Sequence, residues 1–187
     1  MKKSIVLALI IMCSVIVMNA QETLKINTEK SQIKWFGEMT FRFYGHHGFI
    51  KFKKGEFVKV NDKITGGSFV IDMNSISTTD MDNPKANNSL TEHLKNNDFF
   101  DVQSFPIAQL IITNVNYVSS TDVKIVANLT VKDITKVVRF NAKLNFEELE
   151  MTAKFKIDRT RWGINYNSTV KDKAISDAIG FEVVLNL

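Results

Sequence analysis

The sequence is poor in residues that break secondary structure and in those that most often carry chemistry. It has two prolines, one cysteine and three histidines among 187 residues. With only two prolines and as many as 14 phenylalanines, the chain does not resemble an intrinsically disordered protein, which has little apolar surface to bury. The lone cysteine, Cys13, excludes an intramolecular disulfide, and three histidines leave little material for a metal centre.

The longest apolar stretch lies at the N-terminus, over residues 5–17, shortly after a lysine pair. A positive start, an apolar run of about a dozen residues and a small residue at the break are typical of a secretory signal peptide. A membrane-spanning helix would need about 20 apolar residues. We therefore predict that residues 1–20 are a leader, cleaved near Ala20-Gln21. The remainder, 21–187, is expected to form one domain in the periplasm or outside the cell, with no stable membrane insertion.

Cys13 offers one alternative for this segment, a lipid anchor. Lipid attachment normally follows a small residue, but Met12 precedes the cysteine and the apolar stretch continues beyond it. Cleavage after Ala20 would remove the cysteine, so the mature chain would have neither a thiolate nucleophile nor a cysteine-ligated metal.

Charge is nearly balanced once the leader is removed. The full chain has 24 basic and 20 acidic residues, and loss of Lys2 and Lys3 leaves 22 basic ones. A nucleic-acid-binding domain would need basic residues concentrated on one face. No nucleic acid is therefore expected among the partners.

Alternating apolar and polar residues dominate the rest of the chain, as in strands with one buried and one solvated face. The clearest run has Val138, Phe140, Ala142, Leu144 and Phe146 between polar residues. About eight such strands at hairpin spacing predict an all-β antiparallel barrel or sandwich. The runs lie at 32–36, 50–53, 68–73, 123–132, 138–146, 151–157 and 179–187, with turns expected at 53–55, 61–63, 65–67, 119–122 and 132–135.

One short helix is predicted between strands, over residues 87–96. Ser89 is its expected N-cap, since Glu92 follows at capping-box spacing. A second, weaker helical or loop segment is expected at 170–178.

Three interpretations of a small barrel remain open on these patterns. Inward residues of an eight-stranded barrel either fill the interior or surround one small ligand. A dry core would favour an interaction or structural protein, and an apolar cavity would favour a binding protein. A small outer-membrane barrel is the third, although such barrels turn their apolar face outward.

Five segments, in order, resemble the YceI-like family. The central one reads His-Leu-Lys-x-x-Asp-Phe-Phe-Asp at 93–101, followed by Phe-Pro-x-Ala at 105–108. The others lie at 46–48, 66–76, 127–136 and 158–164.

The resemblance implies a secreted or periplasmic lipocalin-like barrel that binds a polyisoprenoid or a fatty-acid derivative, without catalysis and often as a homodimer. Asp133 stands where the family usually has glycine. Because aspartate tolerates the left-handed backbone region better than most residues, we expect this turn to survive.

Strand parity, together with the helical insertion, predicts the residues that line the interior. The segment carrying Leu94, Phe99 and Phe100 would close or gate one end. No catalytic residue, metal site or cofactor is predicted, because no nucleophile–base pair or Gly-x-Ser-x-Gly motif is present. The predicted ligand-binding residues are Ile33, Trp35, His46, Ile50, Phe52, Phe69, Ile71, Leu94, Phe99, Phe100, Leu110, Ile112, Leu129, Phe140 and Phe155.

The polar residues near the predicted interior are expected to have mainly structural roles. His46 and His47 are neighbours on a strand and point to opposite faces, so they are not expected to bind one ion. His46 is expected at the cavity mouth, and His93 is expected to pack the helix against the strands. The charged segment 158–161 is interpreted as a salt-bridged rim, with binding of a phosphate head group as the alternative.

Overall fold

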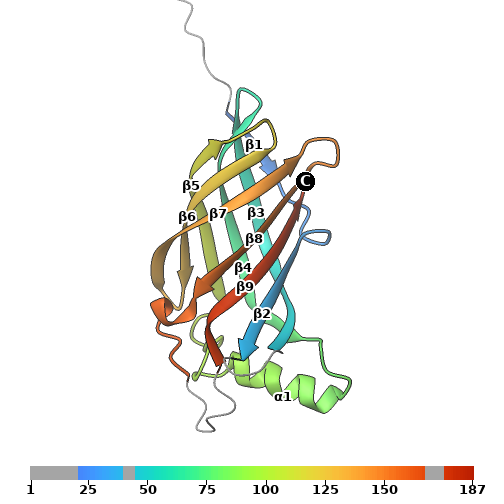
Figure 1. The fold of residues 1–187 in the computed structure, drawn as a ribbon, viewed down its shortest axis with the longest axis vertical. Helices are drawn as coiled ribbons and strands as arrows, with labels where there is room; N and C mark the ends of the chain where they lie inside the picture. The colour runs from blue at the N-terminus through green and yellow to red at the C-terminus, as the bar shows by residue number, and fades with distance from the viewer. Residues whose placement is uncertain (1–20, 40–44, 167–174) are drawn as a thin grey trace, which may run out of the picture.

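The computed structural model describes residues 21–39, 45–166 and 175–187. Within them the chain forms nine antiparallel strands, one α-helix and one short 3-10 helix (Figure 1). The predicted all-β antiparallel barrel with one inserted helix is confirmed. The elements are β1 (Gln21–Lys25), β2 (Gln32–Met39), β3 (Gly45–Val60), β4 (Lys63–Thr78), α1 (Pro84–Lys95), β5 (Ile107–Tyr117), β6 (Asp122–Val131), β7 (Ile134–Asn145), β8 (Glu150–Asp158), η1 (Arg159–Trp162) and β9 (Ile175–Asn186).

Eight of the described strands close into a barrel. Each strand from β2 to β8 pairs with the next along the chain, and β9 pairs with β2 to complete the ring. β1 stands outside this ring. It pairs with residues 56–60 of β3, along the edge that β2 leaves uncovered beyond Ile50.

The inward side chains divide the barrel interior into a filled half and a hollow half. At the end formed by the β3–β4, β5–β6 and β7–β8 turns, large side chains fill the space. Phe57, Val123, Ile125 and Leu144 are each at most 5% exposed there. Burying a side chain of this size contributes about 1.5–3 kcal/mol, so this half holds the barrel together. The hollow half lies toward α1.

Tight turns join the strands where the sequence predicts them at three places. Asn61 and Asp62 have φ of +49° and +61°, and Lys132 and Asp133 have +48° and +58°. Paired positive φ values are the geometry of the hairpin turn that matches strand twist. Asp133 therefore keeps the turn where glycine was expected. Residues 119–122 form the third predicted turn.

The turns predicted at 53–55 and 65–67 are wrong, because both segments lie inside the long strands β3 and β4. Their glycines serve packing instead. A Cβ on Gly55 or Gly67 would lie 2.5 or 3.0 Å from the ring of Phe69, which is 2% exposed. The register between the two strands also shifts next to Lys54, and such a bulge bends a strand without ending it.

The helix begins earlier than predicted. Asn83 caps α1 by accepting a hydrogen bond from the backbone N–H of Lys85 at 3.0 Å, and Pro84 occupies the first turn. Proline is preorganised for that position, so the Asn-Pro pair sets the start. Ser89 lies inside the helix, and its predicted capping role is wrong. The predicted end at Asn96 is confirmed.

Two other boundaries differ from the sequence prediction. Residues 175–178, predicted to be helix or loop, belong to β9, where Ala178 pairs with Asp158 of β8 and Ile175 pairs with Met39 of β2. The rest of that predicted segment lies outside the described residues. Phe146, predicted to continue the apolar face of β7, follows the strand's end and is 51% exposed.

Strands β3 and β4 approach each other closely at Gly48, in the hollow half of the barrel. A Cβ at Gly48 would overlap the backbone carbonyl of Ser77 on β4. A Cβ at Gly66 would find its nearest neighbour at 3.6 Å, which is ordinary contact. Gly48→Ala is therefore expected to lower the free energy of unfolding by at least about 2 kcal/mol, measured by urea denaturation. Gly66→Ala is the matched control and should change it far less. Equal effects would contradict the close approach.

Candidate functional site

The barrel interior contains an apolar cavity of about 200 Å³, and its lining extends from the hollow half to Met151 and Leu185 near the β7–β8 turn. All eight barrel strands contribute to its wall, together with α1, η1 and the segment after α1. The structure brings every predicted ligand-binding residue to this wall: Ile33, Trp35, His46, Ile50, Phe52, Phe69, Ile71, Leu94, Phe99, Phe100, Leu110, Ile112, Leu129, Phe140 and Phe155.

The cavity is long compared with its volume. On β8 its lining runs from Met151 to Ile157, a distance of about 20 Å along a strand at about 3.3 Å per residue. On β9 the lining runs from Ile175 to Leu185. The lining therefore extends along most of β8 and β9.

Polar side chains in the wall gather at one end. Four lining residues are polar or charged: Glu38, His46, Arg159 and Ser176. Glu38 lies near the end of β2, His46 near the start of β3 and Ser176 near the start of β9, and all three positions are at the α1 end of the barrel (Figure 1). Glu38 pairs with Lys156 on the outer face, so His46, Arg159 and Ser176 give the apolar cavity its polar mouth.

His46 is held at this mouth by a carboxylate. Its Nδ1 lies 2.9 Å from Oδ2 of Asp80, and the backbone N–H of His47 donates to Oδ1 of Asp80 at 3.2 Å. Burial of Asp80 opposes its ionisation, but the hydrogen bonds from His46 and His47 outweigh burial and hold the pKa of the carboxyl below its ordinary value.

Arg159 is buried beside the mouth and connects the segments around it by hydrogen bonds. It is 2% exposed, and its guanidinium donates to Asp177 at 2.9 Å and to the backbone carbonyls of Ser176 and Ile164. Asp158 caps η1 by accepting from the backbone N–H of Thr160 at 2.9 Å. For Arg159 these contacts match the predicted salt-bridged rim, because each of its three guanidinium nitrogens already donates to a protein oxygen.

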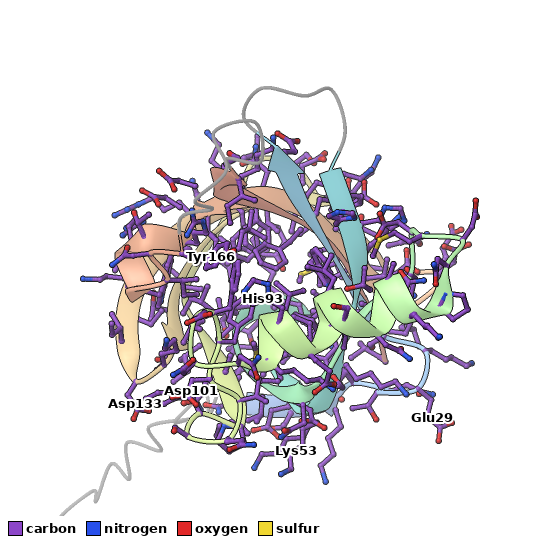
Figure 2. All side chains as sticks on the ribbon, turned by 90° about the horizontal axis from the view of Figure 1, so that it is seen from below. Glu29, Lys53, His93, Asp101, Asp133 and Tyr166 are labelled. Carbon is purple, nitrogen blue, oxygen red and sulfur yellow. The ribbon has the colours of Figure 1, made fainter. Side chains whose placement is uncertain are left out.

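An aromatic cluster lies at the capped end, where α1 crosses the barrel opening (Figure 2). The ring of His93 is 5.2 Å from that of Phe99 and 4.8 Å from that of Tyr166, and Phe99 and Tyr166 are also 4.8 Å apart. The ring of His93, which was predicted to pack the helix against the strands, contacts rings in the segments after α1 and η1. Sequence reasoning missed Tyr166, which lies just after the 158–164 segment and in no alternating run.

Both tryptophans line the cavity, and hydrogen bonds hold them in place. Trp35 and Trp162 are 6% and 1% exposed and line the cavity. Their indole N–H groups donate to the backbone carbonyls of Ser77 at 3.0 Å and Leu129 at 3.1 Å. A buried indole with a satisfied donor fixes the wall around it.

The outer face carries charge. Lys154 and Glu182 face outward on β8 and β9 and form an ion pair at 2.7 Å, and Lys156 pairs with Glu38 at 3.0 Å. At these positions the outer face is charged, unlike the apolar band that outer-membrane barrels turn outward.

None of the helices in residues 21–39, 45–166 and 175–187 is long and apolar enough to cross a membrane. The same residues contain no group of three or more histidine, cysteine or acidic side chains placed to hold a metal ion.

Comparison with known proteins agrees with this architecture. The model of a family described as the YceI-like domain matches residues 24–187. The crystal structure of Burkholderia cenocepacia BcnA is similar with a TM-score of 0.70 and 14% identity, over 86% of this chain and 98% of that one. A Campylobacter jejuni YCEI protein gives 0.51 and 16%, over 67% and 74%. These two likenesses show the fold alone. No curated protein matches the sequence.

The Asp80–His46 contact predicts a pH-dependent contribution to stability. An acid whose pKa is lowered by folding stabilises the protein above its ordinary pKa, about 4, and this contribution is lost as the pH falls through the lower folded value. Asp80→Asn should therefore lower the Tm at pH 7, and the difference from wild type should shrink as the pH falls below about 4. Thermal unfolding across this range measures it.

Asp82→Asn is the control, since Asp82 is exposed and lies two residues away. It should change the Tm little at either pH. A Tm difference for Asp80→Asn that stays constant down to low pH would contradict the role assigned to the carboxylate.

Proposed function

We propose that this chain, which belongs to the YceI-like domain family, binds one long apolar molecule inside its barrel. The observation that supports this most directly is the cavity, whose wall is apolar on all eight strands and polar only at one end. The ligand class that fits is a polyisoprenoid or a fatty-acid derivative, with its chain in the apolar body and its polar end at the mouth.

Burial of the chain supplies enough free energy for such binding. Each buried methylene contributes about 0.8 kcal/mol, so a chain of about sixteen carbons contributes about 13 kcal/mol. Association costs about 4–15 kcal/mol. The balance allows affinities from weak to nanomolar. Because an apolar wall distinguishes one methylene from the next poorly, chain length selects more strongly than head-group chemistry.

The proposed role is carriage or sequestration and not catalysis. The wall acts on its ligand by excluding water. The charged group in the wall that is most deeply buried, Arg159, already donates to Asp177 and two carbonyls. Such an arrangement stores or transports a molecule that water dissolves poorly.

The compartment follows from the leader. We propose that residues 1–20 direct export and are removed, so that the barrel works in the periplasm or outside the cell. Gln21, directly after the proposed cleavage site, already pairs with Val60 on β3. The mature chain would therefore begin at the barrel wall.

A substitution that fills the cavity tests the proposed function. Ala108 faces inward opposite Ile71 and lines the cavity. Ala108→Phe should raise the Kd for a fluorescent long-chain fatty acid, cis-parinaric acid, at least about tenfold, because the added ring occupies the space of the ligand. The Tm should not fall by much, since the ring fills a cavity.

The matched control is Gln109→Phe, which adds the same ring at the next position, on the opposite face of the strand. Its Kd should equal that of the wild type. Unchanged binding by a folded Ala108→Phe variant would contradict binding inside the barrel.

A further inference from the structure

The shortest ladder between neighbouring strands of the described barrel lies between β7 and β8. These strands are twelve and nine residues long, but they form only four ladder pairs, from Ala142–Ala153 to Asn145–Glu150. The neighbouring seams have ten pairs between β6 and β7 and nine between β8 and β9. Residues 134–141 and 154–158, all within the described chain, therefore make no ladder with each other. In Figure 1 the two ribbons separate below their hairpin.

Two aromatic rings take the place of the missing ladder. Phe140 on β7 and Phe155 on β8 stack with their centroids 4.5 Å apart and their planes 15° from parallel. Both rings also line the cavity. At this point a pair of side chains, without hydrogen-bonded backbone between the strands, closes the wall of the cavity.

The 3-10 helix closes the seam below the rings. Trp162 donates its indole N–H to the carbonyl of Leu129 on β6. Exposed Arg161 donates to the carbonyl of Val137 on β7 at 3.3 Å. This last contact is long and made by a solvent-exposed side chain, so it holds the edge of β7 weakly.

Among the described residues, the other sides of the cavity are filled by side chains or tied by hydrogen bonds. Large side chains fill the far half of the barrel. At the capped end, Lys132 donates to the carbonyl of Phe99 at 2.9 Å, and the backbone N–H of Thr78 donates to Thr91 Oγ1 at 3.0 Å. Opening any other described seam would break ladder hydrogen bonds and leave their backbone groups unpaired, which costs free energy for each group. Rotating two phenylalanine rings breaks none.

We propose that the apolar ligand enters and leaves sideways, through the β7–β8 seam, with Phe140 and Phe155 as the gate. This inference rests on the proposed function, because it concerns the same cavity. Rotation of the rings opens a path from solvent, past the exposed Asn141 and Lys154 on the outer face, into the apolar body of the cavity. The polar mouth can then keep its hydrogen bonds while the chain of the ligand passes.

A disulfide across the seam tests the gate. Continuing the β7–β8 register past Ala142–Ala153 places Asn141 opposite Lys154, and both side chains are exposed. The native cysteine, Cys13, lies in the proposed leader, so Asn141→Cys/Lys154→Cys adds the sole pair to the exported protein. The control Lys124→Cys/Asn141→Cys uses the same Asn141 position across the fully paired β6–β7 seam.

The measurement is the rate at which delipidated protein takes up cis-parinaric acid, followed by stopped-flow fluorescence. Oxidised Asn141→Cys/Lys154→Cys should load at least about tenfold more slowly than wild type, and dithiothreitol should restore the rate. The Kd should change little, because a gate slows uptake and release together. The control disulfide should load at the wild-type rate.

Phe140→Ala supplies a second, opposite test that needs no disulfide. Removing one ring should raise the loading rate several-fold even if the smaller apolar contact also weakens binding. A ring that only lined the cavity would change release without speeding uptake. This variant decides the question if the engineered disulfide does not form.

The outcomes separate the gate from the proposed function. Normal loading by the locked protein, or loading by Phe140→Ala that is no faster than wild type, would overturn the gate and leave ligand binding standing. If wild-type protein takes up no fatty acid at equilibrium, the proposed function fails for this class of ligand, and the gate fails with it.

Discussion

Closure of the sheet is the constraint on which the rest of this structure depends. An eight-stranded barrel sends every second residue into one shared interior of nearly fixed width. The sizes of the inward side chains then decide where that interior is solid. Phe57, Val123, Ile125 and Leu144 fill the half near the hairpin turns. Toward α1 the inward residues stay apolar but leave space between them, so the same alternation that builds the core also builds the cavity.

The polar side chains of the cavity wall lie at one end of the barrel. The polar wall residues Glu38, His46, Arg159 and Ser176 meet where strands end and α1 crosses the opening. Most of them are tied to other protein groups, such as Asp80 for His46 and Asp177 for Arg159. The result is a rigid polar mouth above an apolar body. That gradient suits an amphiphile with one polar end.

Strand parity allowed the sequence to predict the barrel and most of its wall, because one face of each strand must be apolar for the barrel to fold. The same reasoning could not locate features that depend on contacts between distant segments. Gly55 and Gly67 suggested turns but make room for Phe69. Tyr166 completes a ring cluster with residues some 70 positions away in sequence. The short ladder between β7 and β8 could not be predicted from the sequence either. Both strands alternate normally, and only their pairing in the structure shows how few residues are joined.

The central claim is that the barrel holds a long apolar molecule where the protein works. The most direct test is organic extraction and mass spectrometry of the protein, purified without detergent from its native compartment. The account predicts a stoichiometric long-chain lipid, isoprenoid or acyl, released on extraction. A folded protein that carries no lipid, and that takes up neither added isoprenoids nor added fatty acids, would contradict it and make the barrel an interaction module with an empty cavity.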